Sequence, residues 1–296
     1  MRGAEEAVAS DLAAPSSGRL IVCPTPIGNL GDITLRGLDA LRTADVIACE
    51  DTRRTRVLLD RYEIAGKLVS FHEHNEDARA AQLLGRIEEG EVVVLVSDAG
   101  MPLVSDPGYA LVRACVERGL PVEVLPGASS VTTAIVASAL PGERWRFVGF
   151  LPRRGAASKR AELTRVLGET PETLVAFESP GRLAATLDVL AALDPERPVA
   201  VCRELTKLHE EVRRGPAATL AAHYREHPPR GEIVLVIGAR PPARPLSPQG
   251  HAGGEEALTA LRALVEAGAR PRPAAAAIAK LMGGSANELY RALLLR

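Results

Sequence analysis

The sequence predicts an α/β protein with two α/β domains and a small helical unit at its C-terminal end. Short apolar runs alternate with amphipathic segments along most of the 296 residues, as in sheets whose strands are joined by helices. The run VVVLV at 92–96 has no polar alternation, which is typical of a strand buried on both faces of a parallel sheet. A segment rich in proline and glycine, 239–254, precedes three short helical patterns. These three observations define the fold class.

The first half of the chain predicts strands interleaved with helices, which gives a largely parallel sheet. We expect strands at 19–23, 46–49, 68–71, 92–96 and 122–125, and helices at 35–41, 52–62, 76–88, 109–118 and 130–139. Polar residues and glycine gather just after several of these strands, as in the loop 97–108. Because ligands of open α/β sheets bind beyond the carboxyl ends of the strands, we expect a binding site at this edge.

The pattern changes around 141–144, and we place a domain boundary near 140–146. Beyond it we expect strands at 147–150, 174–177, 199–202, near Val212 and at 232–237, and helices at 161–167, 183–193 and 217–227. This part predicts a second α/β layer with more antiparallel pairing. The expected division is a disordered extension at 1–18, α/β domains at 19–141 and 142–238, a linker at 239–254 and a helical unit at 255–296.

The helical unit contains three short patterns, at 255–266, 273–282 and 285–294. Ser285 and Glu288 form a capping-box pattern that opens the last of them. The arrangement is similar to a helix-turn-helix, whose last helix reads DNA, but three-helix units also serve as plain packing modules. Both interpretations stay open at this point.

Composition limits the classes of partner. The formal net charge of −1 argues against a strongly basic nucleic-acid binder, so any such binding must come from local clusters of charge. No apolar run approaches the length of a membrane span, and the N-terminus lacks the features of a secretory signal. Cys23, Cys49, Cys115 and Cys202 lie in apolar stretches without metal-binding spacing, which predicts buried, reduced thiols in a cytoplasmic protein and neither a zinc site nor a disulfide framework. We expect no metal and no membrane among the partners.

Common catalytic motifs are absent from the sequence, among them GxGxxG, GxxxxGK[ST], HExxH and GxSxG. Polar segments at strand ends stand in their place. In EDTRRT, Asp51 or Thr52 is expected to cap a helix whose first turns present arginines. In HEHNE, His72 and His74 lack an obvious third ligand, so we favour hydrogen bonding over metal binding.

Nine motifs occur in an order that resembles one known family. They are CPTPIGNLGDIT, CEDTRRT, FHEHNE, VSDAGMPLVSDPGY, LPGASS, GFLPR, FESP, RELTKLHEE and RGEIVLVI, and they span about 20–237. Together they resemble the ribosomal RNA small-subunit methyltransferase I family of the tetrapyrrole-methylase superfamily. Nine ordered motifs are far more specific than any one of them.

The resemblance implies a function and a cofactor. The function is 2′-O-methylation of a cytidine in the decoding region of small-subunit (16S) ribosomal RNA, with S-adenosylmethionine as methyl donor. The resemblance also implies a homodimer of tetrapyrrole-methylase type, with the cofactor in the cleft between the two α/β domains. The family's cofactor positions correspond here to Pro26, Asp98, Ala99, Gly100, Val104, Ser129, Ser130 and Phe177. Met101 and Gly181 depart from the family, which usually has Thr and His there.

A ribose hydroxyl is a poor nucleophile, so a base or a stabilising cation is expected near it. Our candidates, from motifs of the second domain, are Lys207, Glu178, Arg203 and Glu210. For RNA contact we name Arg53, Arg54, His74, Asn75, Arg153, Arg154, Lys159 and Arg160. The last four follow GFLP and are expected in an exposed basic loop, which a merely solvated loop would match equally well.

Two other functions stay open. One is a precorrin-type tetrapyrrole methyltransferase of the same fold, against which the basic loop and the helical unit speak. The other is a ligand-sensing regulator that binds duplex DNA through 285–296 and transfers no methyl group. Labelled methyl donor and small ribosomal subunits distinguish these functions.

Overall fold

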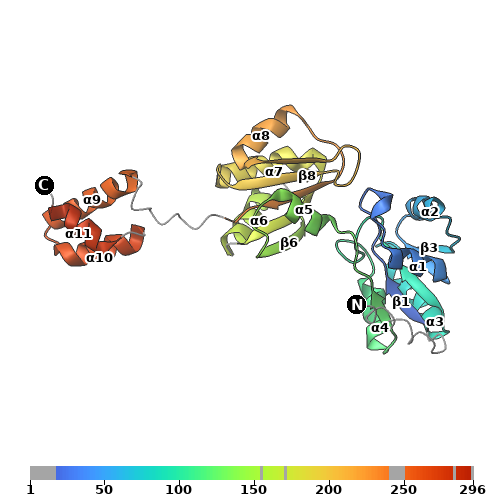
Figure 1. Cartoon of the computed structure of the whole chain (residues 1–296). Coiled ribbons are helices and arrows are strands. Elements are labelled where there is room, and N and C mark those ends of the chain that lie inside the picture. Colours follow the sequence, from blue (N-terminus) through green and yellow to red (C-terminus); the bar gives the residue numbers. More distant parts are fainter. Residues whose placement is uncertain (1–17, 154–155, 170–171, 240–250, 283–284, 295–296) are drawn as a thin grey trace, which may run out of the picture. The chain divides into compact units, whose positions relative to one another are not determined.

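The structure, a computed structural model, describes residues 18–153, 156–169, 172–239, 251–282 and 285–294. These residues fall into two compact units that divide between 239 and 240 (Figure 1). The first unit contains two five-stranded sheets, and the second contains helices. Within these described ranges, no helix is long and apolar enough to cross a membrane.

The first sheet is entirely parallel. Its strands are β1 (Arg19–Val22), β2 (Val46–Cys49), β3 (Leu68–Ser70), β4 (Val92–Leu95) and β5 (Val122–Val124), in the order β3-β2-β4-β1-β5. Strand β4 lies at the centre and is buried at every position, so its apolar run is confirmed as a core strand. Because the strands are parallel, the loops that follow β1, β2, β4 and β5 meet at one edge.

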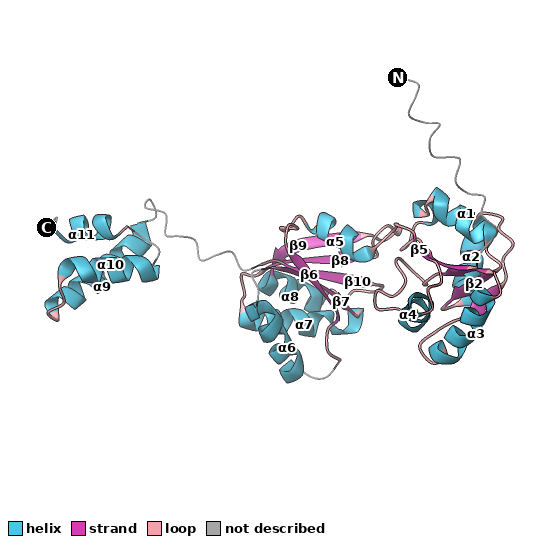
Figure 2. Cartoon of the chain, turned by 90° about the horizontal axis from the view of Figure 1, so that it is seen from below, coloured by secondary structure: helices cyan, strands magenta, loops and turns pink. Residues whose placement is uncertain are grey.

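Helices cover both faces of this sheet (Figure 2). The helices are α1 (Leu35–Thr43), α2 (Thr52–Arg61), α3 (Glu76–Glu88) and α4 (Tyr109–Glu117). Leu41 of α1 and Leu59 of α2 belong to the core on one face. Leu83 of α3 and Leu111 of α4 belong to the core on the other face. A strand sandwiched in this way must be apolar throughout, as β4 is.

The second sheet is mixed. Its strands are β6 (Trp145–Phe150), β7 (Thr173–Glu178), β8 (Pro198–Arg203), β9 (Glu211–Pro216) and β10 (Ile233–Ile237), in the order β6-β7-β10-β8-β9. Only β6 and β7 pair in parallel, so the expected increase in antiparallel pairing is confirmed. Helices α6 (Ala156–Glu169), α7 (Pro180–Leu193) and α8 (Ala217–Glu226) contribute to the core on one face.

The opposite face of the second sheet is covered by α5 (Ser130–Ser138). Val131, Ala134 and Ile135 of this helix pack with β7, β8 and β10. The sequence boundary near 141 would assign this helix to the first α/β domain, but its apolar residues find their partners on the second sheet. Helix α5 therefore follows the first sheet in the chain and completes the core of the second.

The C-terminal unit consists of α9 (His251–Glu266), α10 (Pro271–Met282) and α11 (Ala286–Leu294), packed around a small core that includes Leu261 and Ile278. Three helices were expected here. Helix α9 begins at His251, inside the segment predicted as a linker; residues 240–250 of that linker lie outside the described residues, as do residues 1–17 of the predicted extension. The Glu288 N–H donates to Ser285 Oγ over 3.4 Å, so Ser285 forms its half of the capping box.

All four cysteines are buried and free, as the sequence predicts. Burial raises the pKa of Cys23 to about 12 and the pKa of Cys202 to about 11, so these thiols stay protonated at neutral pH.

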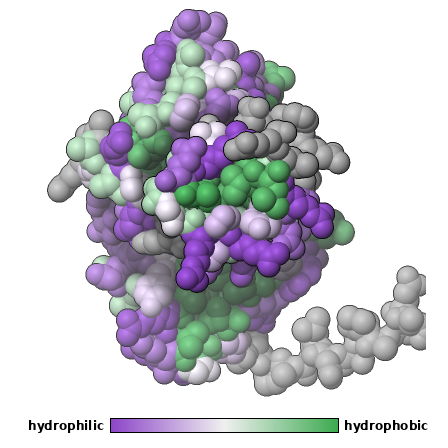
Figure 3. Space-filling view, turned by 90° about the vertical axis from the view of Figure 1, so that its left-hand side faces the viewer, coloured by the Kyte–Doolittle hydropathy of each residue, from purple (hydrophilic) through white to green (hydrophobic). Residues whose placement is uncertain are grey.

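Some large apolar side chains are exposed, among them Val136 and Leu208. Figure 3 shows one face on which apolar residues lie among hydrophilic ones.

Candidate active site

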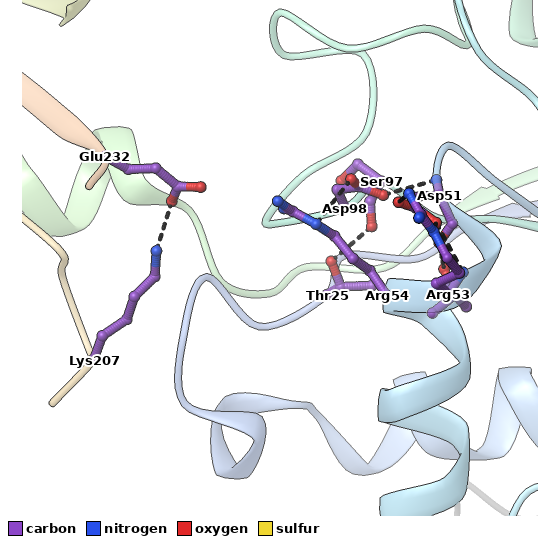
Figure 4. Close-up of polar contacts among 9 residues, drawn as sticks. Thr25, Asp51, Arg53, Arg54, Ser97, Asp98, Lys207 and Glu232 are labelled. Carbon is purple, nitrogen blue, oxygen red and sulfur yellow. Dashed lines mark hydrogen bonds and ion pairs between the residues drawn. The ribbon is translucent and has the colours of Figure 1, made fainter. Parts of the chain in front are cut away.

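The loop after β4 is joined to the loop after β1. Thr25 and Gly100 exchange two backbone hydrogen bonds of 2.9 Å each, and Thr25 Oγ1 donates to the Ser97 carbonyl over 3.0 Å (Figure 4). Gly100 has φ of +84°, and a Cβ at this position would lie 3.3 Å from Ile27. Glycine is therefore the residue that allows this close approach of the two loops.

The same loop holds unusual backbone conformations. Leu103 has φ of 69° and Ser105 has φ of 67°, values that residues other than glycine rarely adopt. Such positions cost free energy and persist only where the surrounding structure enforces them, most often at ligand sites. The backbone thus supports the sequence-based view that this loop binds a ligand.

Asp98 connects the ends of β4 and β2. Its Oδ1 accepts the Asp51 N–H over 2.9 Å, and its Oδ2 lies 3.5 Å from Arg54 Nε (Figure 4). Asp51 in turn caps α2 by accepting the Arg53 N–H over 2.9 Å, as predicted. Hydrogen bonds from the Arg53 side chain and backbone lower the pKa of Asp51 to about 2. Asp98 is thus held in place by the first turn of α2.

A cavity of about 430 Å³ opens between this edge of the first sheet and the second sheet. Its apolar lining comes from both halves and includes Ile27, Val104, Val131, Phe150, Phe177 and Val234. Its polar lining includes Glu50, Arg54, Asp98, Asp106, Ser129, Ser130, Ser179 and Glu232. Concave, largely apolar surface with a few convergent polar groups is the usual form of a small-molecule site.

Carboxyl groups dominate the charge of this cavity. Burial, followed by the negative charge of Glu50, raises the pKa of Asp106 to about 6, although a hydrogen bond with Ser97 lowers it in part. Burial and the charge of Asp98 also raise the pKa of Glu50. Neither Asp106 nor Glu50 is among the sequence-based candidates. Glu50 directly follows β2, and Asp106 lies in the loop that follows β4. Their place after buried strands was the signal in the sequence that could have identified them.

Aromatic rings form one wall of the cavity. Phe177 contacts Phe147 and Phe150 edge to face, with ring centroids 4.9 and 5.3 Å apart. Phe150 remains 56% exposed, so it presents apolar surface at the mouth of the cavity. Such a wall favours a planar, apolar part of a ligand.

Comparisons with known proteins agree with this fold. The family model for Tetrapyrrole (Corrin/Porphyrin) Methylases matches residues 19–221. The protein called "Ribosomal RNA small subunit methyltransferase I" in Micromonospora olivasterospora is 47% identical over 93% of this chain and 86% of its own length. The protein of the same name in Escherichia coli O157:H7 is 41% identical over 93% of this chain and 94% of its own. The chain belongs to the ribosomal RNA small subunit methyltransferase I family.

Solved structures share the fold of this methyltransferase family member. Uroporphyrin-III-C-methyltransferase from Thermus thermophilus superposes with a TM-score of 0.53 and 25% identity, covering 75% of this chain and 94% of that one. A diphthine synthase superposes with a TM-score of 0.59 and 15% identity, covering 74% and 90%. These likenesses, with the family model over residues 19–221, confirm a tetrapyrrole-methylase fold with two α/β domains.

The cavity brings together most of the cofactor positions that the family resemblance implies. Seven of the eight line it: Asp98, Ala99, Gly100, Val104, Ser129, Ser130 and Phe177. Pro26 does not line it; the residue is buried, and its neighbour Ile27 lines the cavity instead. Met101 also lines the cavity, and a Cβ at Gly181 would meet no atom within 4 Å.

Lys207 lies beside the cavity in this methyltransferase fold, not in it. Its Nζ donates over 3.0 Å to Glu232, which lines the cavity (Figure 4). It also donates to Glu204 over 2.9 Å. Partial burial alone would lower the pKa of Lys207, but the hydrogen bonds and charges of these carboxylates outweigh burial and raise it. Lys207 therefore suits the role of a cation better than that of a base.

Glu178, one of the residues predicted to be catalytic, lines the cavity with its carboxylate already bound by other side chains. Its side chain is 0% exposed, with Oε2 accepting from Thr186 Oγ1 over 2.5 Å and from Lys159 Nζ over 3.3 Å. Arg182 holds Oε1 at 2.5 Å. Phe177 and Glu178 both line the cavity, but the Glu178 carboxylate is bound by Lys159 of α6 and by Thr186 and Arg182 of α7. Its carboxylate is a buried structural anion.

Arg203 and Glu210 also lie outside the cavity lining. Arg203 Nε lies 3.2 Å from Glu211 Oε2, and Glu210 Oε2 accepts the Thr206 N–H over 2.6 Å. The Arg203–Glu211 pair links the neighbouring strands β8 and β9, and the hydrogen bond between Glu210 and Thr206 closes the loop between these strands. The sequence placed both correctly near a strand end but could not show which side each would face.

Lys159 corrects the expected basic loop. It lies on α6 and is 5% exposed, with its ammonium between Glu178 and Thr186. The sequence carried a signal for this burial, because Lys159 shares a helical face with Leu163 and Val166 at spacings of four and seven. Arg160 is an exposed residue of the same helix, Arg153 is exposed before it, and Arg154 lies outside the described residues.

The remaining candidates for RNA contact differ in availability. The Arg53 side chain is 89% exposed, and His74 is exposed. Arg54 lines the cavity and faces Asp98. Asn75 serves its own turn, because its Oδ1 accepts the His72 N–H over 2.9 Å. In the part of the chain that the structure describes, no group of three potential ligands could hold a metal ion.

Proposed function

We propose that this protein transfers the methyl group of S-adenosylmethionine to the ribose 2′-hydroxyl of a cytidine in the decoding region of small-subunit ribosomal RNA, as a cytoplasmic homodimer. Relatives that are 41–47% identical over 93% of the chain carry the name of a ribosomal RNA small subunit methyltransferase. The observation that carries the proposal is the cavity, where seven residues expected to bind the cofactor converge from the segments after β4 and β5 and from the second sheet.

The donors and acceptors of the cavity fit this cofactor. Carboxylates such as Asp98 can accept hydrogen bonds from an amino group or from ribose hydroxyls, and they favour a positively charged ligand. Phe150 and Phe177 supply a wall suited to a purine ring. The left-handed conformation of Gly100 lets a ligand approach the backbone closely. When bound, S-adenosylmethionine supplies an electrophilic methyl group on a positively charged sulfur.

The residues of the chain have three tasks in such a transfer. They orient the hydroxyl and exclude water, and orientation alone can supply roughly 7–11 kcal/mol of a barrier. They must also take the hydroxyl proton. Asp106 lies in the cavity with a pKa of about 6, so at neutral pH it is a carboxylate that can accept this proton. The protonated Lys207 at the rim can stabilise developing negative charge.

The test gives the purified protein methyl-labelled S-adenosylmethionine and small subunits from cells that lack the modification. We expect label in the RNA, and mass mapping should place it on the ribose of one cytidine. Subunits from cells that carry the modification serve as the control and should take up no label. Absence of ribose label in the first sample would contradict the proposal.

The same preparation separates the alternatives. Label entering a tetrapyrrole and not the RNA would favour the tetrapyrrole methyltransferase. Tight binding of duplex DNA without methyl transfer to either acceptor would favour the regulator, and that binding should then depend on α11.

A further inference from the structure

A second cavity, of about 380 Å³, lies on the α8 side of the second sheet. Cationic and aromatic side chains line it: Arg203, Arg213, Arg230, His223, His227 and Tyr224. They come from β8, β9, α8 and the segment before β10. None of these residues lines the first cavity, and the proposed methyl transfer leaves them without a role.

One carboxylate organises the arginines. Glu211 is paired with Arg203 in the β8–β9 register, and its Oε2 lies 3.2 Å from Arg203 Nε. Its Oε1 accepts from Arg213 Nε over 3.0 Å. Arg203 also donates to the Arg230 carbonyl over 3.3 Å. The lining contains one carboxylate and three guanidinium groups, so the cavity keeps a surplus of positive charge.

Tyr224 supplies a second, independent observation. Its side chain is 2% exposed, and its hydroxyl has no hydrogen-bond partner within the described structure. Burial raises the pKa of Tyr224 to about 12, and the nearby Arg213 acts against this rise, so the hydroxyl stays protonated beside a guanidinium group. A buried hydroxyl without a partner costs free energy, and an oxyanion in the cavity would remove that cost by accepting a hydrogen bond from it.

The rim of the cavity offers a flat surface. His227 is exposed and stacks on His223, with centroids 4.6 Å apart and planes inclined by 16°. Pro228 and Pro229 continue this rim. Imidazole and proline surfaces of this kind stack on unpaired nucleobases, whereas a free phosphate ion would gain nothing from them. The combination of arginines and stacking surface favours a nucleotide strand.

The second cavity adjoins the first across one end of the sheet. Cys202 lines the first cavity and Arg203 the second, because consecutive residues of β8 face opposite sides. Just before β10, Gly231 likewise lines the first cavity and Arg230 lines the second. A strand that enters the first cavity can therefore pass over this end of the sheet and reach the second.

We propose that the second cavity binds a phosphodiester of the single-stranded ribosomal RNA that flanks the methylated nucleotide. The arginines hold the phosphate oxygens, Tyr224 donates its hydroxyl to one of them, and the His227 rim stacks on an adjacent base. This inference rests on the proposed function, to which it adds the path of the substrate strand.

The test replaces two arginines by neutral residues in the full-length protein, as the double variant Arg213→Gln and Arg230→Gln. The control, Arg225→Gln, removes an equal charge per site from α8, where Arg225 pairs with Asp188 over 2.6 Å. Affinity for unmodified small-subunit RNA is measured against salt concentration. The double variant should bind RNA about tenfold more weakly, with a salt slope smaller by about one per arginine, while its affinity for S-adenosylmethionine stays unchanged.

Tyr224→Phe removes the hydroxyl alone. A purely structural Tyr224 would leave RNA affinity unchanged. The inference predicts weaker RNA binding by roughly threefold together with equal or greater thermal stability, because an unpartnered buried hydroxyl disappears. Unchanged RNA affinity in both Tyr224→Phe and the double arginine variant would overturn the inference.

The binding measurement does not need methyl transfer, so the two proposals fail separately. Normal methylation together with a double variant that matches Arg225→Gln overturns the RNA site and leaves the function standing. No methylation together with the loss of RNA affinity supports the site and contradicts the function. Tight binding of inorganic phosphate alone, with unchanged RNA affinity in the double variant, assigns the cavity to a small anion and overturns the inference.

Discussion

The two cavities beside the second sheet carry opposite charge. Carboxyl groups of Asp98 and Asp106 line the first, whereas Arg203 and Arg213 line the second. A chain with a net charge of −1 can therefore present an acidic site for a cationic ligand next to a basic site for a polyanion. Net charge describes the whole molecule, and function depends on how the charge is divided.

The two cavities also hold their carboxylates differently. Burial would raise the pKa of Glu211, but hydrogen bonds from Arg213 and Arg203 outweigh burial and lower it. The pKa of Asp106 is raised, because burial and the charge of Glu50 act on it together. A carboxylate held between arginines is a structural anion, and a buried carboxyl among other carboxyls is able to exchange a proton near neutral pH.

The largest expected effect comes from taking the cation away from a paired carboxylate. Lys159→Met should lower the free energy of unfolding by about 3 kcal/mol, because it leaves the buried Glu178 with one cation less. Urea unfolding measures the change, and Arg160→Met, an exposed position on the same helix, is the control. Adding Glu178→Gln to Lys159→Met should restore part of the loss. Equal stability of Lys159→Met and Arg160→Met would contradict a structural role for the Lys159–Glu178 pair.

Removing a carboxylate from the first cavity should weaken ligand binding more than it lowers the stability of the fold. Asp98→Ala should weaken S-adenosylmethionine about 30-fold, or about 2 kcal/mol, the scale of a hydrogen bond to a charged group. Stability should fall by about 1 kcal/mol, since the Asp51 N–H loses its acceptor. Titration calorimetry compares it with Asp39→Ala, which removes an exposed aspartate paired with Arg42. Unchanged affinity would exclude Asp98 from the site.

Salt should separate the two cavities without any substitution. Between about 50 and 200 mM salt, affinity for the ribosomal RNA should fall roughly tenfold, because phosphate contacts release counterions. Affinity for S-adenosylmethionine should change by less than about twofold, because its site binds no phosphate chain. Parallel titrations of both ligands measure the two slopes. Equal slopes would show that the basic cavity contributes nothing to RNA binding.

The smallest effect concerns the pH dependence of stability. The folded pKa of Asp106 is about 6, above its ordinary value of 3.8, so the folded state binds this proton more tightly than the unfolded state. The free energy of unfolding should therefore fall as pH rises from about 4 to 6. Asp106→Asn should flatten this dependence and add on the order of 1 kcal/mol at pH 7, after allowance for solvent screening. Urea midpoints between pH 4 and 7 test it, and a pH dependence equal to that of the unsubstituted protein would contradict it.

Local pattern predicted the elements and much of the first cavity. The apolar run of β4 and the cap at Asp51 depend on neighbouring residues, so the sequence was enough for both. The ordered motifs added the identity of the loops that meet at the sheet edge. Pro26 does not line the cavity, because the turn that holds it presents Ile27 there instead.

The remaining features could not be predicted from the sequence, because they depend on pairing between residues that are far apart in the chain. Lys159 was expected in a loop because the start of α6 was placed too late, and its partner Glu178 lies 19 residues away. The basic cavity depends on the register that brings Glu211 opposite Arg203 and on the packing of α8 against those strands. Neither is visible before the antiparallel strands are paired. Local sequence motifs therefore indicate the first, acidic cavity better than the second, basic cavity.

The position of α5 has a consequence for dividing the protein into fragments. A cut at 141, where the sequence pattern changes, would leave Val131 and Ile135 on the first fragment without the sheet that buries them. A cut between 125 and 126 keeps the helix with β8 and β10 and leaves the first sheet whole. Two fragments made at that point are the ones suited to split-protein complementation, and the cofactor cavity would reassemble only when they meet.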